Sequence, residues 1–237
     1  MKGLEGKKAL VTGGTKGIGL SIANRLVTEG CDVVVTGRSK PEVLGDRSFF
    51  SVDFSKEDSL KGLLNFTSSS NFDILINNAG INKIEPVSEI KPETFANIHQ
   101  VNLNAPFLLT QKVLKHMTHS GWGRIVNIGS IFGIISKEYR TSYSTSKYAL
   151  DGLTASVAAE VASKGVLVNT VAPGFIETQL TRSILSEREI DQLTKQVPQR
   201  RLGKPEEIAA LVAFMVSAEN SFISGQCITI DGGFTRV

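Results

Sequence analysis

Short apolar runs rich in β-branched residues recur along the whole chain. They read KALVT, DVVVT, SFFSV, DILIN, GRIVNI, VLVNTV and CITID, and most are followed by a segment with the periodicity of an amphipathic helix. Strands that alternate with helices in this way pair in parallel, because each crossover returns the chain to the same end of the sheet. The pattern predicts an α/β fold with a doubly wound parallel sheet and a ligand crevice at the carboxyl ends of its strands.

The length and continuity of this pattern indicate one folding unit. A chain of 237 residues is long enough for one α/β core, and no internal repeat, linker or low-complexity tract divides it. We therefore expect a single domain over residues 1–237. Analogy with Rossmann-type folds adds an expected order of 3-2-1-4-5-6-7 for seven strands, with helices on both faces. Pro92 and Pro205 mark the first turns of two helices, and Ser55 with Asp58 forms a candidate capping box.

Composition and charge exclude several classes of function. Apolar residues make up 41% and charged residues 21% of the chain, and the net charge of +3 comes from dispersed lysines and arginines. No basic run is interleaved with aromatics, and no apolar stretch approaches the about 20 residues that span a bilayer, so we expect neither a nucleic-acid nor a membrane partner. The N-terminus lacks a sustained apolar segment, so we expect a cytoplasmic protein. His116 and His119 have no third ligand in KHMTH, so we expect no metal site.

A glycine-rich stretch, TGGTKGIG, follows the first apolar run and precedes a helix. Glycines there let the backbone turn tightly and approach a pyrophosphate, whose charge the free N–H groups of the helix N-terminus stabilise. The stretch predicts a dinucleotide site, although its G-x-x-x-G-x-G spacing departs from the common fingerprint and a tight β-to-α connection also uses glycine. The residues expected to contact the cofactor here are Gly13, Thr15, Lys16, Gly17, Ile18 and Gly19.

The end of the second strand sets the choice of nucleotide. An acidic residue would bind the ribose 2′-hydroxyl of NAD, but VVVTGRS offers Arg38 instead, with Thr36 and Ser39 nearby and Lys16 within reach. These side chains suit a 2′-phosphate, so we expect NADP rather than NAD, unless Arg38 is only a solvated loop residue. Asp53, at the end of the third strand, is expected to receive the adenine amine or, alternatively, to cap the next helix.

A tyrosine and a lysine lie four positions apart in TSYSTSKYAL. On a helix, Tyr143 and Lys147 project from one face as neighbours, so the ammonium can act on the phenol. Lowering the pKa of a tyrosine from about 10 to near neutrality takes about 4 kcal/mol, and one ammonium at about 4 Å supplies energy of that order at an effective dielectric near 20. The pair is either incidental or a proton-transfer device.

Five stretches carry a family resemblance: TGGTKGIG, NNAG, the serine of NIGS, YSTSK and PG. Through them the chain resembles the short-chain dehydrogenase/reductase family nearly from end to end. The resemblance implies a catalytic tetrad of Asn102, Ser130, Tyr143 and Lys147. It implies that Tyr143 acts as a general acid towards a ketone or as a base towards an alcohol. It also implies that Ser130 donates a hydrogen bond to the carbonyl oxygen and that Asn102 holds a water linking Lys147 to solvent. The alternative for Ser130 is a polar strand-end residue, and Asn104 is a nearby competitor of Asn102.

The same resemblance implies cofactor contacts after the fourth and sixth strands. The small residues of NNAG let the backbone pass close to the adenine-ribose half, and the Ile176 backbone and Thr178 hydroxyl of PGFIET face the nicotinamide amide. NNAG could instead be a turn, and Thr178 a helix N-cap. The expected contacts in these regions are Asn78, Ala79, Gly80, Tyr143, Lys147, Pro173, Gly174, Ile176 and Thr178.

Within the family, VAPGFIET, VPQRRLGKPEEIA and ISGQCITIDGG are most similar to β-ketoacyl-acyl-carrier-protein reductases. This similarity implies NADPH-dependent reduction of a 3-oxoacyl thioester of acyl carrier protein or CoA, a step of fatty-acid biosynthesis. Two features differ: SKEYRTSY is unusually charged, and Gly121 and Trp122 stand where basic docking residues are common, although Lys164 keeps one docking charge. The alternatives are a dehydrogenase of a sugar, polyol or hydroxy acid and, less favoured, a non-catalytic NADP-binding regulatory subunit.

Two further expectations concern assembly and substrate access. The helices expected at residues 92–119 and 142–162 carry more apolar positions than one sheet face needs, and the family resemblance implies a homotetramer built as a dimer of dimers. The polar segment from Phe175 to Gln199 is a candidate lid, and Glu138 is expected in a substrate loop.

Overall fold

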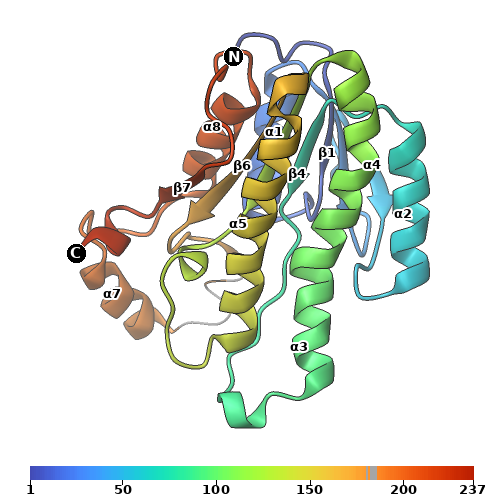
Figure 1. The fold of residues 1–237 in the computed structure, drawn as a ribbon. Coiled ribbons are helices and arrows are strands. Elements are labelled where there is room, and N and C mark those ends of the chain that lie inside the picture. The colour runs from blue at the N-terminus through green and yellow to red at the C-terminus, as the bar shows by residue number, and fades with distance from the viewer. Residues whose placement is uncertain (180, 182–185) are drawn as a thin grey trace.

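The computed structural model describes residues 1–179, 181 and 186–237. Seven parallel strands form one sheet in the order β3-β2-β1-β4-β5-β6-β7, which confirms the expected topology (Figure 1). The strands are β1 (Lys8–Val11), β2 (Asp32–Gly37), β3 (Arg47–Ser51), β4 (Ile74–Asn77), β5 (Gly123–Ile128), β6 (Val166–Pro173) and β7 (Cys227–Ile230).

Helices cover both faces of the sheet. The α-helices are α1 (Gly17–Thr28), α2 (Glu57–Ser69), α3 (Pro92–His99), α4 (Ala105–Ser120), α5 (Thr141–Val161), α7 (Glu187–Gln196) and α8 (Pro205–Val216). A π-helical turn, η2 (Gln100–Asn104), joins α3 to α4. Short 3-10 turns are η1 (Val87–Glu89), η3 (Ile131–Gly133), η4 (Ala162–Lys164) and η5 (Phe234–Arg236). Pro92 and Pro205 each begin their helix, as expected.

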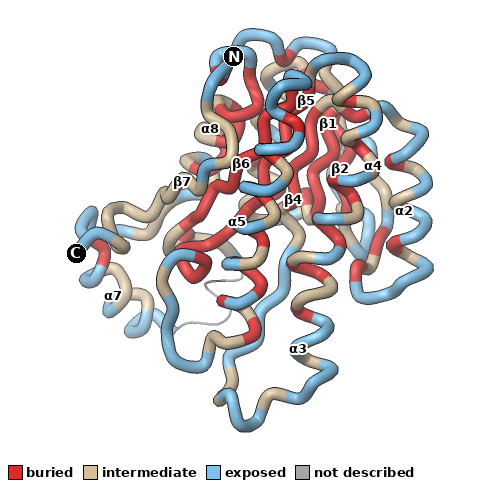
Figure 2. Tube along the Cα trace, in the orientation of Figure 1, coloured by how far each residue is buried: buried red, intermediate tan, exposed pale blue. Residues whose placement is uncertain are grey.

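The core has two layers because successive strand residues point to opposite faces. In β2, Val33 and Val35 belong to the cluster that includes Ile22 of α1 and Val212 of α8. Val34 belongs instead to the cluster formed with α2, α4 and α5. Burial on both faces explains why these strands are continuous apolar runs, and the buried residues follow the strands in Figure 2. No helix within the described ranges is both long enough and apolar enough to cross a membrane.

The capping box expected at Ser55 and Asp58 is wrong. Helix α2 starts at Glu57 and makes no side-chain cap hydrogen bond at Lys56. The Ser55 hydroxyl donates to Asp53 Oδ1 over 2.6 Å, and the Ser55 amide donates to the same oxygen. Ser55 bonds to the carboxylate of Asp53, two residues upstream, instead of capping the helix, because short polar side chains bond readily to adjacent backbone in turns.

Candidate active site

The carboxyl ends of β1, β4, β5 and β6 bring together segments that are far apart in the sequence. Parallel pairing places Val11 beside Ile76, Asn77 beside Asn127 and Ile128 beside Val171. The stretches TGGTKGIG, NNAG and NIGS and the PG dipeptide therefore all lie at, or directly after, the same edge of the sheet. This arrangement matches the crevice that the sequence pattern predicts.

The glycine turn before α1 can accept an anion. Gly13 and Gly17 have φ of 63° and 55°, in the left-handed region that favours glycine. A Cβ on Gly19 would lie 2.4 Å from both Asn78 Nδ2 and the Gly13 carbonyl oxygen. Within the described chain, α1 has neither a side-chain N-cap hydrogen bond nor an acidic residue in its first turn. Its first N–H groups and the positive end of its dipole are therefore free to bind a phosphate group.

Thr12 links the glycine turn to NNAG, a role that no sequence motif predicts. Its buried hydroxyl accepts hydrogen bonds from the amides of Asn78 (2.9 Å) and Ala79 (3.0 Å) and donates to the Ile76 carbonyl. Asn78 Nδ2 donates in return to the carbonyls of Thr12 (2.8 Å) and Gly13 (3.2 Å). The Asn78 side chain therefore holds the glycine turn against NNAG. The sequence signal for this link is the threonine that precedes the glycine pair of TGGTKGIG.

The region expected to bind the adenosine half contains both free and engaged side chains. Arg38 and Lys16 are exposed, whereas Thr36 is buried and its hydroxyl accepts a hydrogen bond from the Gly13 amide. Hydrogen bonds from the Ser55 side chain and backbone lower the pKa of Asp53, and the charge of Arg38 adds to the effect. Asp53 therefore organises its own turn, and its contact with adenine stays a prediction.

Ser130 and Tyr143 meet through their hydroxyl groups. Ser130 lies two residues beyond β5, and its Oγ accepts a hydrogen bond from the Phe132 amide over 3.1 Å, which directs the hydroxyl. Burial raises the pKa of Tyr143, against the lowering effects of the Ser130 hydrogen bond and the charge of Arg140. The expectation that Lys147 lowers this pKa is wrong: burial removes the phenol from water, and the Lys147 ammonium donates its hydrogen bond to the Ile128 carbonyl instead.

Lys147 is anchored to the sheet. Its side chain is buried, and Nζ donates a 2.7 Å hydrogen bond to the Ile128 carbonyl, 5.6 Å from the centroid of the Tyr143 ring. Burial lowers the pKa of Lys147 to about 8. A Cβ on Gly80 would lie 3.7 Å from Lys147 Nζ and 3.4 Å from Asn102 Oδ1, so NNAG passes close to both side chains.

Asn102 clamps the segment after NNAG to α5. It lies in the π-helical turn, and π-helical turns occur frequently at functional sites. Its Oδ1 accepts from the Ile81 amide, while Nδ2 donates to the Ile81 carbonyl and to the Ser146 hydroxyl, each within 3.0 Å. The competing Asn104 only reaches Gln100 at the surface. A side chain with this many partners is a clamp, and its expected role in holding a water stays a prediction.

The PGFIET segment borders the glycine turn. A Cβ on Gly17 would lie 3.7 Å from the Thr178 methyl group, and Ile176 forms a parallel bridge with Gly203. The Thr178 hydroxyl accepts a hydrogen bond from the amide of Thr181, three residues on, which is the bond of the alternative N-cap assignment. Residues 180 and 182–185 of the candidate lid lie outside the described residues.

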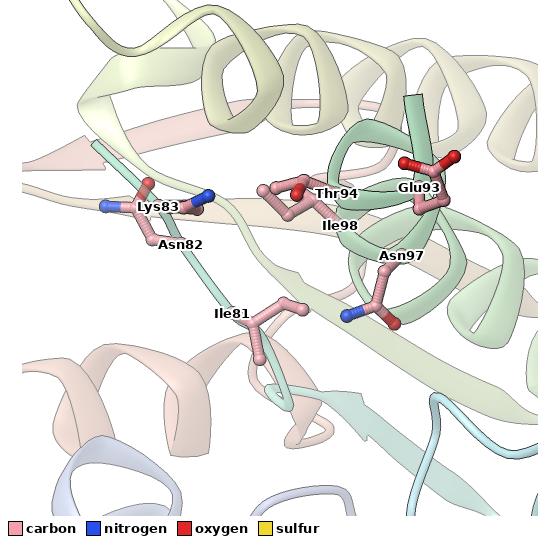
Figure 3. A pocket seen from close by; sticks show the side chains of 7 residues that line it. All are labelled: Ile81, Asn82, Lys83, Glu93, Thr94, Asn97 and Ile98. Atoms are coloured by element: carbon pink, nitrogen blue, oxygen red, sulfur yellow. The ribbon is translucent and has the colours of Figure 1, made fainter. Parts of the chain in front are cut away.

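The remaining candidates lie outside this cluster. His116 Nε2 lies 3.6 Å from Asp73 Oδ1, and the described residues contain no group of three potential metal ligands. Figure 3 shows a pocket between the segment after NNAG and α3, beside the site. The residues that line it are Ile81, Asn82, Lys83, Glu93, Thr94, Asn97 and Ile98, and none is a predicted site residue.

Comparison with known proteins agrees with this geometry. A family model described as enoyl-(acyl carrier protein) reductase matches residues 13–235. This chain belongs to that family of short-chain dehydrogenases/reductases. The 3-oxoacyl-(acyl-carrier-protein) reductase of Vibrio cholerae is 39% identical over 243 residues, covering 99% of each chain.

Two solved structures give the same fold. A gluconate 5-dehydrogenase from Burkholderia cenocepacia J2315, in complex with NADP and tartrate, is 29% identical, with a TM-score of 0.90 over 98% of this chain and 96% of that chain. The ligand-free aldohexose dehydrogenase of Thermoplasma acidophilum is 32% identical, with a TM-score of 0.91 over 98% and 95% of the two chains. This short-chain dehydrogenase/reductase is therefore an oxidoreductase.

Proposed function

We propose that this short-chain dehydrogenase/reductase uses NADPH to reduce the ketone of a 3-oxoacyl thioester to a 3-hydroxyacyl product. The observation that carries the proposal is the pairing of the Ser130 and Tyr143 hydroxyls beside the buried ammonium of Lys147. Two hydroxyls that meet at one point can both bond to one carbonyl oxygen. The 3-oxoacyl-(acyl-carrier-protein) reductase of Vibrio cholerae, similar over nearly the full length, supports the substrate class.

Three parts of the chain support NADPH as the cofactor. The uncapped first turn of α1 would bind the pyrophosphate, and the exposed Arg38 and Lys16 would bind the 2′-phosphate. Gly80 leaves room beside Lys147 for the cofactor to reach the catalytic side chains. When bound, NADPH supplies the hydride that the ketone carbon accepts. The NADP complex of the gluconate 5-dehydrogenase supports this choice of cofactor.

Side chains of the tetrad donate the proton and stabilise the charge that develops on the substrate oxygen. Burial raises the pKa of Tyr143, so the phenol holds its proton at neutral pH and can give it to the substrate oxygen. Ser130, directed by the Phe132 amide, donates a hydrogen bond to that oxygen as negative charge develops. Lys147 places a positive charge behind the phenol, and Asn102 holds the neighbouring backbone in position.

A second candidate substrate is a sugar, a polyol or a hydroxy acid. The two solved structures of similar fold carry the names gluconate 5-dehydrogenase and aldohexose dehydrogenase. In this chain, Glu138 and Arg140 make the segment before Tyr143 polar, which favours a polar substrate. A non-catalytic regulatory role is disfavoured, because all four members of the expected tetrad are present.

The assembly and the carrier partner are part of the proposal. Phe107 of α4 and Tyr148 of α5 are 46% and 47% exposed, and apolar surface on these helices supports a homotetramer built across them. Lys164 is exposed in η4 and could attract an acidic acyl carrier protein. Light scattering measures the mass of the assembly in solution and so tests the homotetramer. For the carrier partner, Lys164→Glu should raise the KM for a carrier-bound substrate without changing the KM for a CoA thioester.

The test of the function measures NADPH oxidation near 340 nm with three substrates. These are acetoacetyl-CoA, crotonoyl-CoA and 5-keto-gluconate, each offered to the wild type and to Tyr143→Phe. Turnover of acetoacetyl-CoA that depends on Tyr143 supports the proposal. Turnover of crotonoyl-CoA alone would replace ketone reduction with enoyl reduction, and turnover of 5-keto-gluconate alone would favour the sugar-acid alternative.

A further inference from the structure

A strained residue precedes Arg140. Tyr139 has φ of 64°, in the left-handed region that a bulky aromatic residue rarely adopts. Contacts on both sides hold it there. The Tyr139 carbonyl accepts from the Glu85 amide over 3.2 Å, and the next carbonyl, that of Arg140, accepts from the Ser144 amide over 2.7 Å at the start of α5. Strain that the surrounding structure maintains is often found at ligand-binding positions.

The strained turn leads into an arginine whose side chain lies over the site. Arg140 Cζ is 5.2 Å from the centroid of the Phe132 ring, and the Phe132 amide directs the Ser130 hydroxyl. Arg140 is partly buried, and its burial lowers the pKa of the guanidinium. The charge of Arg140 acts to lower the pKa of Tyr143, against the larger effect of burial, so the guanidinium lies close enough to the phenol for the two groups to interact. The guanidinium is therefore near the reacting groups rather than in open solvent.

Among the residues that the structure describes, no carboxylate forms an ion pair with this cation. Within residues 1–179, 181 and 186–237, every ion pair involves other side chains, and the ring of Phe132 and the phenol of Tyr143 are the only groups that the structure assigns to the guanidinium. A partly dehydrated cation is costly unless an anion joins it. Arg201, by comparison, is exposed and still paired through two hydrogen bonds with Glu207. The missing anion at Arg140 points to a ligand.

We propose that Arg140 binds the carboxylate of a free 3-oxo acid, so that the enzyme reduces free 3-oxo acids to 3-hydroxy acids in addition to thioesters. This inference rests on the proposed ketone reduction at Ser130 and Tyr143. In a 3-oxo acid the carboxylate is two bonds from the ketone carbon. When the ketone oxygen bonds to the two hydroxyls, the carboxylate is therefore held close to the phenol, the group with which Arg140 interacts. The planar guanidinium suits a carboxylate, to which it can donate two parallel hydrogen bonds.

The chemical step is that of the proposed function. The ketone carbon accepts the hydride from NADPH, the ketone oxygen accepts the Tyr143 proton, and NADP⁺ and the 3-hydroxy acid are the products. The carboxylate is unchanged throughout. Arg140 is a specificity-determining residue. Among small substrates that have neither CoA nor a carrier protein, its contribution should appear as a preference for a charged C1 group over a neutral one.

The experiment compares acetoacetate with its methyl ester, which has the same ketone and no charge. Arg140→Gln should lower kcat/KM for acetoacetate about 10- to 100-fold more than for the ester, mainly through KM, because a charge-assisted hydrogen bond is lost. Arg140→Lys should recover part of the preference. Lys137→Gln, which removes an exposed cation from the same segment, is the matched control and should change neither substrate.

Two results would overturn the proposal while leaving ketone reduction intact. One is a wild type that reduces the ester but not the acid. The other is an equal loss for acid and ester in Arg140→Gln, which would mean that Arg140 acts only through Tyr143 or the fold. If neither ketone reacts, calorimetry of 3-hydroxybutyrate binding to the protein with NADPH decides: binding at least tenfold weaker in Arg140→Gln than in Lys137→Gln supports the site, and equal or undetectable binding rejects it.

Discussion

Lys147 Nζ donates a 2.7 Å hydrogen bond to the carbonyl oxygen of Ile128, the last residue of β5. The bond ties the ammonium to the sheet instead of to Tyr143, one helical turn away. It also holds a charge in a buried place, where the pKa of Lys147 falls to about 8. The ammonium is therefore close to titration in the ordinary working range of an enzyme, and this has a measurable effect on stability.

Lys147 should make the protein more stable as the pH rises above 8. Between its folded pKa of about 8 and the ordinary lysine pKa of 10.5, the unfolded chain binds the additional proton, so the free energy of unfolding increases with pH. The gain between pH 7.5 and 9.5 is about 2 kcal/mol. Urea unfolding of Lys147→Met should lack this increment relative to the wild type. Lys115→Met, at an exposed position of α4, should keep it, and parallel pH profiles for wild type and Lys147→Met would contradict the assignment.

Removing the hydroxyl of Tyr143 or of Ser130 should slow the chemical step with little change in the affinity for NADPH. Tyr143→Phe should lower kcat by about 10²- to 10⁴-fold because the proton donor is lost, and Ser130→Ala by about 10²-fold or more because the oxygen loses a donor. NADPH affinity, measured by fluorescence titration, should stay within a few-fold. Tyr148→Phe is the control, since that hydroxyl is on the same helix and bonds to the Ile134 carbonyl. Full activity in Tyr143→Phe would remove this tyrosine from the mechanism.

Arg38 should control the preference for NADPH over NADH. Arg38→Glu should lower kcat/KM for NADPH about 10- to 100-fold, because a charge-assisted contact with the 2′-phosphate becomes a repulsion, while NADH should be used equally well or better. The ratio of the two steady-state values is the measurement. Lys40→Glu alters charge at another exposed position two residues on and should leave the ratio nearly unchanged. A ratio that moves equally in both variants would indicate only a general surface-charge effect.

Two glycines in helices should respond oppositely to alanine. Gly19→Ala places a Cβ 2.4 Å from the Gly13 carbonyl oxygen and from Asn78 Nδ2, and should lower the free energy of unfolding by about 1–3 kcal/mol and weaken NADPH binding. Gly62, exposed in α2, has no atom within 4 Å of an added Cβ. Gly62→Ala should stabilise the protein by about 0.5–1 kcal/mol through helix propensity. Equal unfolding midpoints in urea for the two variants would refute this account of the turn.

The Thr12 hydroxyl should be needed to hold NNAG against the glycine turn. Thr12→Val removes the acceptor of the Asn78 and Ala79 amides, and should cost about 2 kcal/mol or more in unfolding free energy, with weaker NADPH binding. Thr12→Ser keeps the hydroxyl and should lose much less. Urea unfolding of the two variants gives the comparison, and a Val variant as stable as the Ser variant would show that the amides find other acceptors.

Local patterns predicted the elements and many of their neighbours. The apolar runs and their helical partners predicted the parallel sheet, and the glycines predicted the turn before α1, where Gly13 and Gly17 adopt positive φ. The four-residue spacing of Tyr143 and Lys147 predicted that they lie on one face of a helix, and the family resemblance implied that Ser130 joins them. These predictions succeed because backbone sterics, helix periodicity and strand alternation depend on residues close together in the chain.

The amino-acid sequence by itself determined the sheet, the glycine turn and the order of the expected catalytic residues. The tertiary structure decided what each polar group bonds to and what it costs to charge it. Lys147 donates a hydrogen bond to the Ile128 carbonyl, and Asn102 forms hydrogen bonds with Ile81 and Ser146. Arg140 lies over the ring of Phe132 and forms no ion pair within the described residues. The pKa values of Tyr143 and Lys147 moved in directions set by burial. The physical reason is that desolvation and hydrogen-bond partners come from segments distant in the chain, whose approach no local spacing encodes.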